Sequence, residues 1–439
     1  MENMIPLNGR IAIVDDKIEQ ALPLMRVLAK NNIPYTYYKG SDPEYLPDSP
    51  CNDIRILFLD LNLLDGRDNQ PKDIKSTLYS TIHRIISPQN FPYVVILWSR
   101  QEKEYKETIE CLFKEELKDL APIIVLNWIK SDFFPNFAEN EENKEKEYII
   151  FEELIKVLST IPAYGYLMQW ENCAHISADT TIKKLFRNYN SSEEWSNYAN
   201  CILDMFAHSY LEKNFNDSTP EKKAKASLLF LNDVFNDTLE SNVSNVHIQN
   251  ATELQCEVSD ESRDNIKAKI NRTLLMSDQK ESLNQPGCVL SYNNPTKDIT
   301  TFYHKIFNDS INTKGLSTRD LKAIKNKIYV NLQPCDVVVT PACDYAQKKN
   351  EYDRIVQGVI LEAEFQQYIN KSSEAIYISP IFEYDSRKSI IVLNFRYFKT
   401  DKLRDEDEKL FLFRMRTSLL SEIQSKLSRH INRQGIMNL

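Results

Sequence analysis

With 439 residues, the chain is longer than most single domains, and we expect at least two. Its 42% hydrophobic and 10% aromatic residues supply material for packed cores and exclude a wholly disordered chain. A net charge of -9 disfavours nonspecific nucleic-acid binding, and the 8 glycines form neither a GxGxxG nor a GxxxxGK[ST] phosphate loop. Eight scattered cysteines, no signal peptide and no membrane-length apolar run predict a cytoplasmic protein without membrane or nucleic-acid partners.

The first 160 residues alternate short apolar runs with stretches of helical periodicity. Strands are predicted at 10–16, 34–38, 54–59, 93–98 and 122–129, and helices at 17–30, 72–87, 102–118 and 145–160. Such an alternation of βα units predicts a doubly wound parallel sheet with right-handed crossovers.

Polar residues stand where these predicted strands end, namely Asp15, Asp16, Asp60, Ser99 and Lys130. Ligands of open α/β sheets bind in the crevice at the carboxyl ends of the strands. Converging carboxylates repel one another, and a bound Mg²⁺ ion with its hard oxygen ligands would relieve that repulsion. Each residue also has an ordinary alternative: aspartates cap helices, a serine begins a turn, and a lysine is usually a solvated charge.

This pattern over residues 8–160 resembles the receiver domain of bacterial response regulators, a flavodoxin-like fold of the CheY-like superfamily. The resemblance implies that Asp60 accepts a phosphoryl group from a histidine kinase or phosphotransfer protein and forms an aspartyl phosphate. It also implies that Lys130 stabilises the transferring oxygens and that Ser99 follows the phosphoryl group as a switch. The implied Mg²⁺ ligands are Asp15, Asp16, Asp60 and the main-chain carbonyl of Asn62.

Two positions near Lys130 depart from the family pattern. Ser131 follows the lysine where the family usually has proline, and Asn127 stands three residues before it, where an aromatic switch residue is normal. The acceptor residues are complete, so the departures point to a different signalling surface.

From residue 163 to about 280 the chain reads as mainly helical, which places a domain boundary near 160–165. Helical segments are predicted at 202–210 and 224–235, whereas 237–262 is polar and is expected to be rich in loops. Cys173 and His175 could ligate zinc, but their spacing is unusual, and a buried thiol beside a hydrogen-bonded histidine is the favoured interpretation. His208 is expected to be structural as well.

Residues 281–439 are predicted to form a β-rich α+β domain. Strands are predicted at 287–292, 327–332, 335–340 and 354–361, a hairpin at 375–384 and 389–398, and a closing amphipathic helix from Glu406 to Asn432.

One motif in this domain, Thr340-Pro341-Ala342-Cys343-Asp344, is similar to a strand-end motif of uncharacterised prokaryotic proteins associated with anti-phage defence. A packed Cys343 with Asp344 capping the turn is the favoured interpretation. Alternatively Cys343 is a nucleophile assisted by Asp344 or His430, or it joins Cys335 in a metal site.

We therefore expect a phosphorelay signalling protein whose receiver controls a C-terminal effector or docking domain that does not bind DNA. The alternatives are a receiver-gated hydrolase that uses Cys343 and a phosphate sink with a scaffold domain. No metabolic activity is expected beyond phosphorylation and dephosphorylation of the receiver. The sequence leaves the kinase, the downstream target and the oligomeric state, including a homodimer, open.

Overall fold

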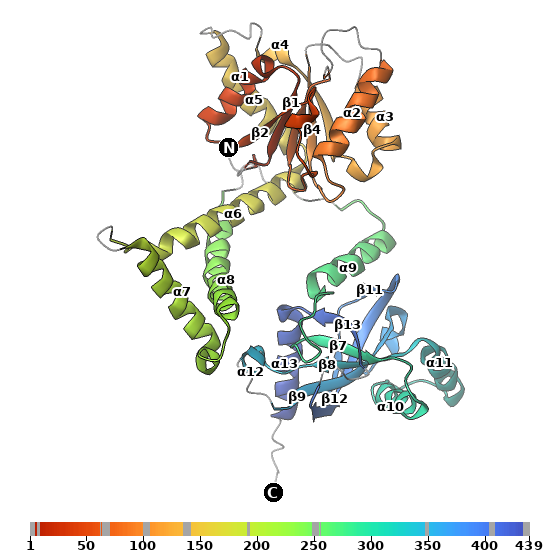
Figure 1. Cartoon of the computed structure of the whole chain (residues 1–439). Coiled ribbons are helices and arrows are strands. Elements are labelled where there is room, and N and C mark those ends of the chain that lie inside the picture. The colour runs from red at the N-terminus through yellow and green to blue at the C-terminus, as the bar shows by residue number, and fades with distance from the viewer. Residues whose placement is uncertain are drawn as a thin grey trace. The chain divides into compact units, whose positions relative to one another are not determined.

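The protein, represented by a computed structural model, forms two compact units, Met1–Leu203 with Leu228–Gln255 and Asp204–Ser227 with Cys256–Leu439 (Figure 1). The structure describes residues 5–6, 9–61, 63, 71–99, 106–134, 142–190, 194–247, 254, 256–346, 351–403 and 409–432. None of the described helices combines the length and the apolar character needed to cross a bilayer.

A five-stranded parallel sheet forms the centre of the first unit. Its strands are β1 (Ile11–Asp15), β2 (Tyr35–Lys39), β3 (Ile56–Leu59), β4 (Val94–Ser99) and β5 (Ile124–Ile129). They pair in the order β2-β1-β3-β4-β5, which is the flavodoxin-like strand order. All five predicted strands are present, so the predicted five-stranded parallel sheet is confirmed, and its order fits a flavodoxin-like fold.

Helices cover both faces of this sheet, as Figure 1 shows for α1 and α5 on one side and α2 and α3 on the other. Alternate residues of β1 point to opposite faces: Ile13 packs in the cluster of α1 and α5, and Val14 in that of α2 and α3. The helices are α1 (Ile18–Lys30), α2 (Pro71–Ile85), α3 (Lys106–Glu115), the unpredicted single turn α4 (Lys130–Phe133) and α5 (Glu142–Ser159).

The following helix, α6 (Pro162–Leu185), is anchored to the edge of the sheet where the strands begin. Glu171 of α6 forms ion pairs with Arg10, which precedes β1, and with Arg55, which precedes β3, where Nε lies 3.1 Å from Oε2. The hydroxyl of Tyr164 donates a hydrogen bond to the Arg55 carbonyl over 2.8 Å. Helix α6 is therefore fixed to the opposite edge from Asp15 and Asp60.

Two further helices, α7 (Trp195–Leu211) and α8 (Pro220–Asn245), follow, which confirms the helical character predicted for the middle of the chain. The prediction of a loop-rich 237–262 is wrong at both ends, since α8 runs to Asn245 and α9 begins at Asp260. Polar residues there join helices instead: Asn242 donates to the Ser177 hydroxyl over 2.8 Å, and Thr238 accepts from Lys184 over 3.1 Å.

The second unit contains an antiparallel sheet of eight strands. They are β6 (Met276–Ser277), β7 (Cys288–Tyr292), β8 (Gln333–Val338), β9 (Asp353–Glu362), β10 (Ile376–Ile378), β11 (Phe382–Tyr384), β12 (Arg387–Asp401) and β13 (Lys409–Met415). The order is β10-β12-β9-β8-β7-β13-β6, and β11 pairs with β12 in the predicted hairpin. The sheet curls into a half-barrel, and the rings of Phe382 on β11 and Phe413 on β13, which are not neighbouring strands, lie 5.6 Å apart.

Helices pack on both faces of the half-barrel. They are α9 (Asp260–Leu275), α10 (Lys297–Asn308), α11 (Thr318–Asn331), the short α12 (Ala342–Ala346) and α13 (Thr417–Ile431). Ile423 of α13 packs in the cluster of one face, and Phe307 of α10 with Ile328 of α11 in that of the other. The prediction of a β-rich α+β domain is thus compatible with the structure.

Two local predictions in this unit are wrong. Of the predicted strand 327–332, residues 327–331 belong to helix α11 and Leu332 follows its end. Ile328 is buried and Val330 is 81% exposed, which is not the alternating pattern of a strand. The closing helix begins at Thr417 and not at Glu406, because Lys409–Met415 pairs with β7 as strand β13. Pairing with the distant strand β7 therefore makes Lys409–Met415 a strand and not part of the helix.

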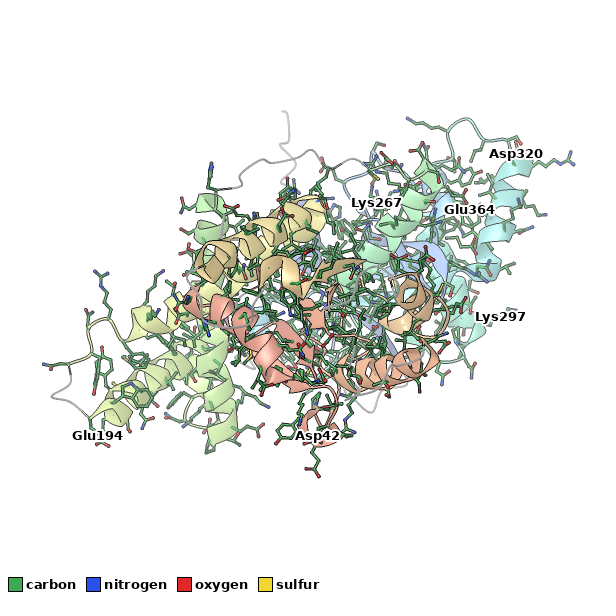
Figure 2. The ribbon with its side chains drawn as sticks, turned by 90° about the horizontal axis from the view of Figure 1, so that it is seen from above. Asp42, Glu194, Lys267, Lys297, Asp320 and Glu364 are labelled. Carbon is green, nitrogen blue, oxygen red and sulfur yellow. The ribbon has the colours of Figure 1, made fainter. Side chains whose placement is uncertain are left out.

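Charged side chains normally lie at the surface, as Figure 2 shows for Lys297, Asp320 and Glu364. Asp336 in the middle of β8 is different, because it is fully buried. The Asp336 carboxylate accepts hydrogen bonds from Tyr303 and Gln357 and pairs with Lys409, whose Nζ lies 2.8 Å away. These contacts join β8 to its neighbour β9, to helix α10 and to strand β13.

Replacing Glu171 by Gln should weaken the attachment of α6. Two guanidinium groups would lose their carboxylate, and we expect the free energy of unfolding to fall by about 1.5–3 kcal/mol. Fluorescence reports on this unit, since all four tryptophans lie in Met1–Leu203. The matched control on α6 is Asp179→Asn, because the Asp179–Lys183 pair is exposed and should contribute less than about 1 kcal/mol. Equal effects of the two changes would contradict this account.

Replacing Asp336 by Leu should leave Lys409 without its buried carboxylate. We expect a loss of about 3–5 kcal/mol in the free energy of unfolding of the second unit, measured by circular dichroism during urea denaturation. The exposed Asp264→Leu change on α9 is the control. A stability equal to that of the parent protein would mean that the buried polar cluster contributes nothing net.

Candidate functional site

Four strands of the first unit end at one edge of the sheet, and each end carries a polar residue. Asp15 is the last residue of β1, Asp60 follows β3, Ser99 ends β4 and Lys130 follows β5. Because the strands are parallel, these ends share one edge. The structure thus brings Asp15, Asp60 and Lys130 into direct contact, as the chain order of the motif predicts.

Three carboxylates form the centre of the site. Asp15, Asp16 and Asp60 are buried, and each offers an oxygen atom within 4.8 Å of the others. Within the described residues this is the only group of three or more potential metal ligands from aspartate, glutamate, histidine or cysteine. The three carboxylates are therefore close enough together to hold one metal ion.

Asp15 uses its two oxygen atoms differently. Oδ1 accepts a hydrogen bond from the backbone N–H of Lys17 over 3.0 Å, whereas Oδ2 lies 2.7 Å from Nζ of Lys130. The local turn therefore fixes the orientation of the carboxylate. Asp15 does not cap α1, whose N-cap residue is Lys17 and which has no side-chain cap; its bond to the Lys17 N–H lies in the turn before the helix and leaves the second oxygen for the site.

Lys130 places a fully buried ammonium group between two of the acids. Its Nζ lies 2.7 Å from Asp15 Oδ2 and 2.8 Å from Asp60 Oδ2, and its side chain has 0% exposure. A buried lysine is costly unless it is paired, and here two carboxylates and one amide oxygen receive its three N–H donors. The amide belongs to Gln20, 3.3 Å away.

The electrostatic balance of the site favours an added cation. The pKa of Asp15 is raised to about 7, first because burial penalises the carboxylate and second because Asp60 lies nearby, while Lys130 acts in the opposite direction. One ammonium therefore does not offset the burial of the acids. Three clustered carboxylates are hard oxygen donors of the kind that Mg²⁺ prefers, so the residues fit a divalent cation.

Of the two remaining residues of the expected site, the structure describes only Ser99. Ser99 is 1% exposed at the end of β4, opposite Ile129 of β5, and so lies on the same sheet edge. Asn62, the expected carbonyl ligand, lies outside the described residues.

Two residues near the acids were missed from the sequence. Gln20 contacts Lys130, and the hydroxyl of Tyr37 on β2 donates to the Asp15 carbonyl over 3.1 Å. Burial and the Asp15 charge raise the pKa of Tyr37 to about 12, so the phenol keeps its proton. The only signal for Gln20 was its place in the first helical turn after the acidic pair; Tyr37 gave none.

The second site expected from the sequence lies in the other unit. Helix α12 begins two residues after Thr340 and contains Cys343 and Asp344. The Thr340 hydroxyl accepts from the backbone N–H of Arg354 over 2.9 Å, and Asp344 pairs with the Arg354 guanidinium at 3.4 Å. The motif thus ties its loop to β9. A nucleophilic role of Cys343 stays a prediction, because its side chain lies outside the description.

A cavity of about 440 Å³ lies beside this motif, between the loop and α13. Its lining is Val339, Pro341, Arg354, Phe398, Gln424, Leu427, Ser428, Ile431 and Asn432. Cys335, the suggested metal partner of Cys343, lies in the core of β8, where burial raises the pKa of its thiol well above the usual value. The zinc alternative for Cys173 is likewise unsupported among the described side chains, since Cys173 belongs to no metal-ligand group.

The raised pKa of Asp15 predicts how pH affects stability without divalent cations. The folded protein keeps this proton above the usual carboxyl pKa of 3.8, so its stability should fall as pH rises from about 4 to about 7. Asp15→Asn should flatten this dependence and raise the melting temperature at pH 8, measured by tryptophan fluorescence in EDTA. Asp119→Asn, at an exposed position, should leave both unchanged. A lower melting temperature of Asp15→Asn at pH 8 would mean that the Lys130 pairing dominates.

Comparison with protein-family models, with curated proteins and with solved structures gave no match. The assignment of the first unit therefore rests on its strand order and on the contacts of its side chains. Together they define a flavodoxin-like α/β unit with a buried acidic site suited to a metal ion.

Proposed function

We propose that the chain is a phosphorelay signalling protein whose first unit is a receiver domain. In this proposal Asp60 accepts a phosphoryl group from a histidine kinase or phosphotransfer protein, with Mg²⁺ as cofactor. The state of Asp60 then controls the C-terminal half, an effector or docking domain that does not read DNA.

One observation carries the proposal: a fully buried ammonium joins two aspartates at the carboxyl edge of a 2-1-3-4-5 sheet. A structural salt bridge would pair one lysine with one acid. Here one lysine pairs with two acids, a third acid lies within 4.8 Å of them, and the pKa of Asp15 is raised in spite of the lysine. Perturbed groups that converge in this way are typical of reaction sites.

The proposed chemistry gives each of these side chains a role. A carboxylate oxygen of Asp60 attacks phosphorus, the P–N bond of a phosphohistidine breaks, and the released imidazole nitrogen takes up a proton. Asp15, Asp16 and Asp60 would hold Mg²⁺, which would supply positive charge to the phosphoryl oxygens. Lys130 provides a second positive charge at Asp60, and burial strengthens its effect.

Ser99 and α6 are the routes by which the acceptor would influence the rest of the chain. Ser99 ends β4 on the same edge as Asp60, and its hydroxyl is the family's switch group. Helix α6 is bound by Glu171 to the residues that precede β1 and β3, the strands that carry Asp15 and Asp60. Rearrangement of these strands would therefore reach α6 directly.

Labelling with acetyl phosphate tests the proposal. The full chain should take up one acid-stable, base-labile phosphoryl group when Mg²⁺ is present and none in EDTA. Asp60→Asn should abolish uptake, and Lys130→Met should slow it by about a hundredfold, the effect expected for loss of one charge-stabilising donor.

Asp119→Asn is the control and should label like the parent protein. Unchanged labelling of Asp60→Asn would show that another residue accepts the group. No labelling of a folded parent protein by acetyl phosphate or by a kinase would refute the receiver assignment.

A further inference from the structure

The ammonium group of Lys130 has three N–H donors, and the structure gives it three acceptors. Two are the carboxylates of Asp15 and Asp60, at 2.7 and 2.8 Å. The third is the side-chain carbonyl oxygen of Gln20 at 3.3 Å. Gln20 is thus the one neutral acceptor among the described contacts of Lys130.

Each acceptor comes from a different element. Asp15 ends β1, Asp60 follows β3, and Gln20 lies in the first turn of α1. The backbone N–H of Gln20 donates to the Lys17 carbonyl over 2.9 Å, which fixes that turn. Gln20 therefore projects from a rigid helix start and not from a loop.

The proposed reaction makes different demands on the three acceptors. Asp15 would become a ligand of the cation, and Asp60 would become the acyl phosphate, so both carboxylates lose part of their negative charge toward Lys130. The amide of Gln20 carries no charge and takes no part in either change. It is the one acceptor whose strength toward the ammonium stays the same throughout.

We propose that Gln20 is a positioning residue that keeps the Lys130 ammonium at Asp60 while cation and phosphoryl group engage the carboxylates. This inference rests on the proposed function, since it assigns Gln20 a task in that reaction. Without Gln20 the ammonium would have no protein acceptor of constant strength and would spend less time at the phosphoryl oxygens.

The test compares Gln20→Met, which removes the acceptor, with Gln20→Glu, which keeps an oxygen at the same length. We expect acetyl phosphate labelling at saturating Mg²⁺ to slow about tenfold in Gln20→Met, as for a lost hydrogen bond to a charged group, and to recover in Gln20→Glu. In Gln20→Met, the Mg²⁺ concentration that gives the half-maximal change in tryptophan fluorescence should shift less than about twofold. The reason is that Gln20 contacts Lys130 and is not one of the proposed Mg²⁺ ligands.

The matched control is Glu19→Met, the neighbouring and exposed position of the same helical turn. It should label at the parent rate. If Gln20 were merely structural, Gln20→Met would lower the melting temperature and weaken Mg²⁺ binding together, and Gln20→Glu would not restore labelling. Parent-like labelling of Gln20→Met would overturn the proposal.

A second readout does not depend on phosphoryl transfer. Acylation of Lys130 by acetic anhydride, followed by mass spectrometry in Mg²⁺, should be faster in Gln20→Met than in the parent protein or Glu19→Met. If the parent protein accepts no phosphoryl group, the proposed function fails. In that case the acylation rate of Lys130 alone tests whether Gln20 positions the ammonium group. Equal acylation of Lys130 in all three proteins would then refute its positioning role.

Discussion

The first unit depends on one buried electrostatic contact, the ammonium of Lys130 held against Asp15 and Asp60. Moving a lysine and three carboxylates out of water is expensive, and their mutual attraction repays that cost only in part. The raised pKa of Asp15 reflects this shortfall. A fold selected for stability alone would fill this edge with apolar side chains, and the retained charges therefore support the proposed reaction site.

The two edges of the parallel sheet differ in the charged contacts that they carry. At the carboxyl edge, charges are buried with an excess of acid. At the opposite edge, Glu171 of α6 is shared between Arg10 and Arg55, which gives a compact ion cluster with partly exposed side chains. One edge thus carries an acidic cluster suited to a metal ion, and the other holds a helix. Residues in or next to β1 and β3 take part at both edges, so these two strands connect the acidic site with helix α6.

The sequence was sufficient where apolar periodicity and chain order determine the structure. Asp60, Lys130 and the five strands could be placed because apolar strands alternate with amphipathic helices. Gln20 and Tyr37 could not, since their contacts depend on side-chain rotation and on spatial neighbours. In the second unit the segment 327–332 was misread because a short apolar run suits a helix or a strand, and strand β13 was missed because its partner β7 lies more than one hundred residues earlier. The buried Asp336 gave no signal, because burial of a strand residue on both faces depends on covering helices.

The most direct test of the account identifies the atom that receives the phosphoryl group. The full chain would be treated with acetyl phosphate and Mg²⁺, reduced with borohydride, digested and examined by mass spectrometry. We predict that Asp60 alone is converted to homoserine, the product of reducing an acyl phosphate. A folded protein in which Asp60 stays unmodified, or in which another carboxylate is reduced instead, would contradict the central claim.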